Sequence, residues 1–69
     1  MSSAALAKAI LDAGGYANVG RQMRVTRAAV WKWVHGAGKV PAERVIELSR
    51  VIKVPYSRIR PDIYPEDWR

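Results

Sequence analysis

Five basic side chains and no acidic one lie between positions 21 and 39 of the sequence: Arg21, Arg24, Arg27, Lys32 and Lys39. A segment that needed charge only for solubility would normally carry both signs. An unbroken basic segment is instead typical of a surface that binds phosphate groups through Coulomb attraction. We therefore expect the function of the chain to depend on this segment.

The composition of the whole chain favours a binding protein over an enzyme. The 12 Lys and Arg residues against 6 Asp and Glu give a net charge of +6 and a pI near 10.3. Cysteine is absent, which excludes a disulfide, a thiolate metal site and a thiolate nucleophile. The single histidine, His35, cannot build a metal site alone. Glu43 and Glu47, one turn apart, are interpreted as surface ion-pair partners. We expect no catalysis, cofactor, metal or small-molecule substrate.

The length of 69 residues indicates one small domain, 1–69. Such a chain buries only about 60% of its unfolded surface, although its 49% of hydrophobic residues suits a globular core. The apolar run near the N-terminus is interrupted by Lys8 and Asp12 and is too short to span a bilayer. It also lacks the order of regions found in a signal peptide. We expect a cytoplasmic protein without membrane contact.

Helical spacing predicts an all-α chain, a compact bundle of four to five short helices. Ser2 and Ser3 can cap a first helix, which Gly14-Gly15 ends because glycine accepts a left-handed conformation. Its apolar positions recur at intervals of three and four: Leu6, Ala9, Ile10 and Ala13. A second helix is expected from near Tyr16 to about Met23.

The rest of the chain divides into a third helix, a fourth helix and a tail. Thr26 can cap the third helix, which is expected to stop at Gly36. Pro41 suits the first turn of the fourth helix, and Pro55 ends it. The tail, about 55–69, is predicted to be mostly extended and wrapped over the rest, apart from one helical turn around residues 56–59. A two-strand ribbon is the less favoured alternative there, because prolines remove ladder donors.

The second and third helices predict a helix-turn-helix over about 16–35. This unit needs a small residue where its helices cross closely, and Gly20 lies there. Apolar residues stand at the offsets that face the core: Val19, Met23, Val25, Val30 and Trp33. Arg24 occupies the turn position that usually holds a left-handed glycine, at a cost of about 1 kcal/mol.

Four further motifs accompany this unit: Ala13-Gly14-Gly15, Ala29-Val30-Trp31-Lys32-Trp33, Val40-Pro41-Ala42-Glu43-Arg44 and Arg60-Pro61-Asp62-Ile63-Tyr64-Pro65. With them, the stretch from Ala5 to Pro65 resembles the small Cro-type repressors of temperate phages and the related YdaS-like antitoxin and regulator family of bacteria. The tail motif is the most distinctive of the four. The resemblance implies a lambda-repressor-like fold in a bacterial host cell. It also implies sequence-specific operator binding, usually as a dimer, with repression of a neighbouring promoter.

The N-terminal residues of a recognition helix meet base edges in the major groove. This predicts base contacts by Thr26, Arg27, Ala28, Trp31 and Lys32. Arg27 is the best candidate for direct readout, because a guanidinium can bond O6 and N7 of guanine together, worth roughly 1–3 kcal/mol of discrimination. Ala28 either touches a thymine methyl or is simply a helix former. Trp31 points roughly 200° away from the core-facing Trp33, so it is expected to be exposed and to contact DNA or the tail.

A second group of residues is predicted to contact phosphate: Tyr16, Ala17, Arg21, Arg24, Lys39 and Arg44. The amides of Tyr16 and Ala17 qualify because they open a helix, whose N-terminus attracts anions. Contacts of this kind position a protein without specifying sequence. His35 is interpreted as a histidine that suits the C-terminal end of a helix dipole, in preference to a phosphate contact or a pH role.

The tail is too apolar for a free end, since it contains Ile63, Tyr64 and Trp68. It either caps the small core or forms a two-fold interface, and we expect these three residues to contribute to a homodimer, which would stabilise so short a chain.

The leading hypothesis is a phage or prophage Cro-like repressor that binds a palindromic operator in double-stranded DNA through the major groove. A dimer would read two half-sites about one helical turn apart, roughly 34 Å. The alternative within the family is an antitoxin-type regulator that binds a toxin partner and autoregulates its operon. An adaptor whose basic face binds acidic proteins is a third hypothesis. An RNA-binding protein is weaker, because the aromatic residues are not arrayed on a strand platform.

Overall fold

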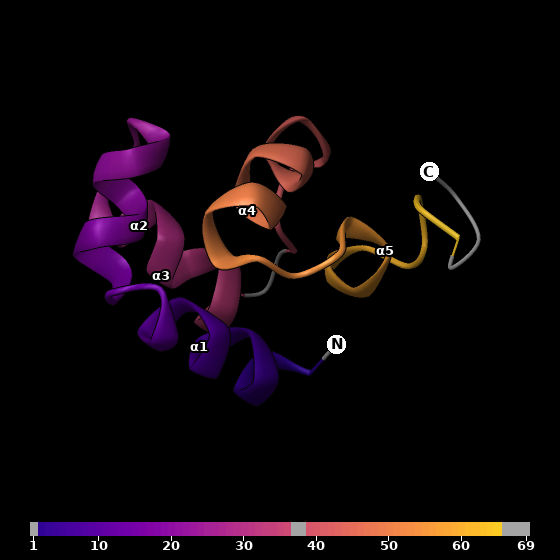
Figure 1. Cartoon of the computed structure of the whole chain (residues 1–69), viewed down its shortest axis with the longest axis horizontal. Coiled ribbons are helices and arrows are strands. Elements are labelled where there is room, and N and C mark those ends of the chain that lie inside the picture. The colour runs from indigo at the N-terminus through magenta and orange to yellow at the C-terminus, as the bar shows by residue number, and fades with distance from the viewer. Residues whose placement is uncertain (1, 37–38, 66–69) are drawn as a thin grey trace.

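The helices of the chain begin and end close to the predicted positions. The computed structural model describes residues 2–36 and 39–65. The elements in order are α1 (Ser3–Asp12), α2 (Tyr16–Met23), α3 (Arg27–His35), the 3-10 helix η1 (Ala42–Arg44), α4 (Val45–Ile52) and α5 (Tyr56–Ile59) (Figure 1). The described ranges contain no strand, which confirms the all-α prediction.

Side-chain caps start the first and third helices as predicted. Ser2 Oγ accepts a hydrogen bond from the Ala5 amide at 3.1 Å, and Thr26 Oγ1 accepts one from the Ala29 amide at 3.1 Å. Each oxygen satisfies an amide that has no partner inside the helix. The two caps therefore fix where α1 and α3 begin.

Two glycines make the corner between α1 and α2. Gly14 and Gly15 have φ values of 106° and 95°, which residues with a Cβ rarely adopt. The side chain of Asn18 closes this corner, because its Nδ2 donates to the Ala13 carbonyl at 2.7 Å. The corner lets α2 start directly at Tyr16 without a linker.

The fourth helix begins differently from the prediction. Pro41 precedes a short 3-10 turn, η1, which runs on into α4. The Arg44 amide donates to the Pro41 carbonyl at 2.9 Å, the i to i+3 bond of a 3-10 helix. At the other end, Lys53 adopts a left-handed conformation with φ 58°, two residues before Pro55. The proline thus lies beyond the helix end, as predicted.

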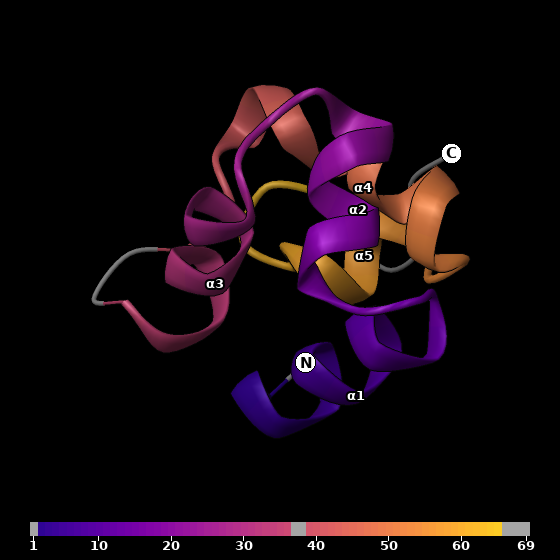
Figure 2. The same ribbon diagram turned by 90° about the vertical axis from the view of Figure 1, so that its left-hand side faces the viewer.

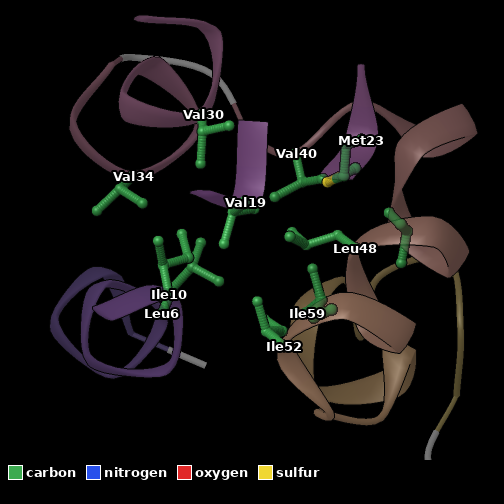
Figure 3. Close-up of a cluster of buried hydrophobic side chains, with 11 residues drawn as sticks. Leu6, Ile10, Val19, Met23, Val30, Val34, Val40, Leu48, Ile52 and Ile59 are labelled. Atoms are coloured by element: carbon green, nitrogen blue, oxygen red, sulfur yellow. The ribbon is translucent and has the colours of Figure 1, made fainter. Parts of the chain in front are cut away.

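The core gathers side chains from all five α-helices and from the loop before η1 (Figure 3). Its buried members are Leu6, Ile10, Val19, Met23, Val30, Val34, Val40, Val45, Leu48, Ile52 and Ile59. Val25 and Trp33 are only half-buried and pack against its edge. The apolar stripe of α3 is therefore centred on Val30 and Val34, and Trp33 lies beside it.

The two ends of the molecule carry different elements. α2 and α3 lie at one end of the long axis, and α5 with the described part of the tail lies at the other (Figure 1). The tail was predicted to be extended, but the amides of Ile63 and Tyr64 both donate to the Arg60 carbonyl, at 3.1 and 2.9 Å, and make a turn. Residues 66–69, which include Trp68, lie outside the described residues.

Helices across the described ranges are all too short or too polar to cross a membrane.

Candidate nucleic-acid interface

The crossing of α2 and α3 depends on Gly20. This glycine is buried, and a Cβ placed on it would lie 2.9 Å from the Val25 carbonyl oxygen and 3.2 Å from the carbonyl carbon of Thr26. Both neighbours are backbone atoms, which cannot rotate away. The prediction of a small residue at a close crossing is correct, and the close neighbours are the turn and the cap of α3. The contact fixes how α3 projects from the molecule.

The turn itself holds a non-glycine residue in a left-handed conformation. Arg24 has φ 58° and ψ 39°, and the next amide, that of Val25, donates to the Gly20 carbonyl at 2.8 Å. The side chain of Arg24 is exposed. The departure from glycine seen in the sequence thus leaves the expected turn geometry intact and adds a cation between the two helices.

A concavity of about 530 Å³ lies on the exposed side of α3. Five residues line it: Tyr16, Arg27, Ala28, Trp31 and Lys32. The structure therefore brings together four of the five predicted base-contacting residues and adds Tyr16 from the start of α2. α2 and α3 lie beside one another at this end of the molecule (Figure 2). Thr26, the fifth predicted base-contacting residue, is exposed, but its hydroxyl is engaged in capping α3.

An aromatic bracket joins the start of α2 to the end of α3. The rings of Trp31 and His35 have centroids 4.4 Å apart, and His35 Nε2 lies 3.3 Å from Tyr16 Oη. Trp31 stays half exposed, as predicted, and its ring stacks on His35. This contact of His35 was not predicted from the sequence. Its spacing of four from Trp31 signals a shared helix face, but Tyr16 is 19 residues away and gives no local signal.

The cations of α2 and α3 carry no compensating acid. Arg21, Arg24, Arg27 and Lys32 form no ion pair with any residue of the described ranges, and Arg21 instead donates to Asn18 Oδ1 at 3.3 Å. Exposed cations elsewhere include Arg50 and Lys53 on and after α4, which likewise have no ion pair in those ranges. Of the described cations, Arg27 and Lys32 of α3 line the concavity.

Two predicted phosphate contacts lie apart from the concavity. Lys39 Nζ is 3.7 Å from Asp62 Oδ2, and Arg44 Nη1 is 3.4 Å from Glu47 Oε1. Lys39 lines a separate hollow of about 320 Å³ between the start of α1 and the tail. Ala17 is exposed in the first turn of α2, where Gly15 provides no side-chain cap. Of the predicted phosphate residues, Tyr16 lines the concavity, whereas Lys39 and Arg44 do not.

A family comparison identifies the chain at this point. The model of the family described as bacterial toxin YdaS matches residues 6–68. The chain belongs to this family. The match confirms the predicted YdaS-like resemblance and indicates a small regulatory or toxin-associated protein. No curated protein and no solved structure gives a significant match.

The matched region includes the distinctive tail motif, and the structure gives it a role. The Arg60 guanidinium donates to both carboxylate oxygens of Asp62, from Nε at 2.9 Å and from Nη2 at 2.7 Å, and its Nη1 donates to the Val40 carbonyl at 2.6 Å. We call these three residues the tail strap. The hydrogen bonds between Arg60 and Asp62 hold the pKa of the Asp62 carboxyl group well below its usual range and raise the pKa of the Arg60 guanidinium.

Two of the residues expected in a dimer interface, Ile63 and Tyr64, differ in their exposure in this YdaS-family chain. Ile63 is 40% exposed, whereas Tyr64 packs against the core of its own chain with its ring centroid 5.0 Å from that of Tyr56. Tyr64 thus caps the core, one of the two roles foreseen for the tail. Trp68, the third expected residue, lies outside the described residues.

Side chains suited to metals do not gather in the described part of the YdaS-family fold. No group of three or more His, Asp or Glu residues there could hold a metal ion.

Proposed function

We propose that this YdaS-family chain is a transcriptional regulator that binds double-stranded DNA in a sequence-specific manner, with α3 in the major groove. One observation carries the proposal: the concavity on α3 is lined by predicted contact residues, and two of them, Arg27 and Lys32, are cations that no described acid neutralises. Phosphate attraction supplies affinity, and side chains that reach base edges supply specificity. Both kinds of side chain are present on one face.

The position of each side chain suggests its role. Arg27 is the first residue of α3 and lines the concavity, which suits a bidentate bond to guanine O6 and N7. Lys32, five residues further along, lines the same concavity and can reach a base or a phosphate. Arg21 and Arg24, on α2 and the turn, suit phosphates of the backbone that α2 crosses. The uncapped first turn of α2, with Tyr16 and Ala17, suits one more phosphate.

The finer form of the proposal is a Cro-like repressor of phage or prophage origin that acts as a homodimer on a palindromic operator. Exposed Ile63 in the tail supports a role for the tail in pairing two copies. α3 and the tail lie at opposite ends of the long axis, so pairing through the tail leaves α3 of each copy accessible (Figure 1). Two recognition helices would then read half-sites about one turn of DNA apart, roughly 34 Å.

Selection of binding sites from random duplexes at near-physiological salt tests the proposal. We expect an enriched inverted repeat and a steep loss of affinity with salt. Arg27→Ala should relax the preference at one position per half-site by roughly 1–3 kcal/mol. Arg24→Ala should weaken all sequences alike and lower the salt slope by about one.

A matched control is Arg50→Ala, which removes another exposed arginine, from α4. It should change neither the selected site nor the preference at any of its positions. Binding without enrichment would reduce the interface to a basic surface. Equal, sequence-blind losses in Arg27→Ala and Arg24→Ala would remove the readout role of Arg27.

The family description favours a second candidate function, a toxic activity in bacterial cells. Induced expression of the wild-type chain and of Arg27→Ala separates the two candidates. Growth arrest that disappears with Arg27→Ala would mean that toxicity acts through DNA sites. Growth arrest that persists while operator binding is lost would assign toxicity to another target. An antitoxin-type regulator stays an alternative, and it predicts a stable complex with a protein toxin encoded beside it.

A further inference from the structure

The residues that line the concavity on α3 are of two chemical kinds. Arg27 and Lys32 supply cationic heads, whereas Tyr16, Ala28 and Trp31 supply two aromatic rings and a methyl group. Cations match the acceptor atoms of bases and phosphates. Base edges in the major groove offer one apolar group as well, the C5-methyl of thymine. Among the base edges of the major groove, apolar side chains at this place therefore match the methyl group of thymine.

Ala28 is the residue best placed to meet a base edge without a polar atom. It is the second residue of α3, is exposed, and follows directly after Arg27. Its side chain is one methyl group, which neither donates nor accepts a hydrogen bond. Trp31 lies three residues further along, on the same side of the helix, and is 50% exposed. The two apolar side chains line the same concavity as Arg27.

The aromatic bracket holds the Trp31 ring in place before any ligand binds. His35 stacks on Trp31 with ring centroids 4.4 Å apart, and Tyr16 Oη lies 3.3 Å from His35 Nε2. A side chain that is already ordered loses less rotamer freedom on binding. A larger part of the favourable free energy of a small apolar contact therefore contributes to affinity. Exposure alone would not give this advantage, because an unbraced tryptophan would first have to be ordered.

We propose that Ala28 and Trp31 recognise the C5-methyl of a thymine that adjoins the guanine read by Arg27 in each half-site. This inference rests on the proposed function, because it assumes that α3 enters the major groove. His35 is a positioning residue in this account: it touches Trp31, while Ala28 and Trp31 touch the methyl group. The specificity of the site then combines one hydrogen-bonded base with one methyl-bearing base.

Replacement of thymine by deoxyuridine tests the inference, because it removes the C5-methyl and leaves every hydrogen-bonding atom in place. Each thymine of the selected duplex is replaced singly, and affinity is measured by fluorescence anisotropy with the full chain. We expect a loss of about fourfold at one thymine per half-site, the effect of one buried methyl group, and no change at the others. Trp31→Ala should reduce that ratio towards one.

Two variants make the test specific. Leu11→Ala removes another exposed apolar side chain, from α1, and should keep the full discrimination between thymine and uracil. His35→Ala should reduce the ratio while the guanine preference of Arg27 stays intact. A merely structural role for His35 would instead weaken both preferences together.

The outcomes separate this inference from the proposed function. An enriched site in which every thymine tolerates uracil, or which has no thymine beside the guanine, would overturn methyl recognition and leave DNA binding in place. Equal weakening of thymine and uracil duplexes by Trp31→Ala would also overturn it, because the ring would then contact the sugar-phosphate backbone. Failure to enrich any site would overturn the proposed function itself.

Discussion

Replacement of Arg24 tests the turn on which the whole interface depends. Arg24 links α2 to α3 with φ 58° and ψ 39°, a left-handed conformation in which Cβ crowds the following carbonyl oxygen. Arg24→Gly removes the Cβ and the charge, whereas Arg24→Ala removes the charge and keeps the Cβ. The difference between the two variants therefore isolates the backbone conformation.

The expected difference follows from two opposing terms. A non-glycine residue in this conformation costs roughly 1–2 kcal/mol. Glycine also lowers the stability by about 0.5–1 kcal/mol, because it gives the unfolded chain more conformational freedom. We expect Arg24→Gly to be more stable than Arg24→Ala by about 1 kcal/mol, which corresponds to roughly 4–8 °C in Tm for a domain of this size.

Lys53 offers an internal control for the same backbone geometry. It ends α4 with φ 58° and ψ 42°, nearly identical to Arg24, and Figure 1 shows that this helix end lies away from the turn between α2 and α3. Lys53→Gly and Lys53→Ala should show the same stability difference. DNA binding should separate the two positions: both Arg24 variants lose affinity equally, and neither Lys53 variant does.

Thermal and urea unfolding followed by circular dichroism measure the stabilities, and anisotropy titrations measure the affinities. Equal stabilities of Arg24→Gly and Arg24→Ala would refute a left-handed residue in this turn. A stability difference between the two Lys53 variants without one between the two Arg24 variants would mean that the left-handed turn of the helix-turn-helix is wrong. Unequal DNA affinities of the two Arg24 variants would mean that the turn conformation, and not the charge, governs binding.

Three further substitutions follow from particular contacts. Gly20→Ala should lower the free energy of unfolding by about 1–3 kcal/mol in urea, because the new Cβ would lie 2.9 Å from a backbone oxygen. Ala17→Gly is the control, since it measures how much a change between glycine and alanine alone affects α2. An unchanged unfolding midpoint in Gly20→Ala would contradict the close crossing of α2 and α3. Thr26→Ala should cost about 1 kcal/mol in the same assay, whereas Thr26→Ser should retain the cap; equal losses would argue against capping. Asp62→Asn should flatten the acid dependence of Tm, since the lowered pKa of Asp62 stabilises the fold above about pH 4 and this contribution is lost as the pH falls further; parallel curves for the two proteins would disprove it.

Helix ends were predictable because they depend on local chemistry. Ser2 and Thr26 cap amides three residues away, and Gly14 needs only its own backbone conformation. The 3-10 start of the fourth helix was not predictable, since its apolar spacing fits an α-helix equally well. The turn of the tail at Arg60 was missed for a related reason. Three prolines suggested extended chain, and no local signal reveals that the Arg60 side chain finds a carbonyl 20 residues away.

In the candidate site, too, the features that depend on local sequence were predictable, and those that depend on distant contacts were not. The docking geometry of a recognition helix predicted base contacts by Arg27, Ala28, Trp31 and Lys32, and the structure gathers them around one concavity. Counting charges, in contrast, does not reveal which acid neutralises which base. Lys39 belongs to the same basic run as Arg27, yet it lies against Asp62 of the tail, which only the folded chain shows.

The arrangement of ion pairs affects the orientation in which the chain attracts a polyanion more than it affects the stability of the fold. The described pairs use Asp12, Glu47 and Asp62, all of which lie outside α2 and α3. Exposed pairs of this kind contribute only about 0–1 kcal/mol each, so stability gives little reason for their placement. They offset positive charge on α1, in η1 and near the tail, whereas the cations of the helix-turn-helix keep theirs, as do Arg50 and Lys53. A net charge of +6 spread evenly would attract a polyanion in any orientation. Under the proposed function, the cations of α2, the turn and α3, which have no described acid partner, favour the encounter in which the concavity faces the DNA.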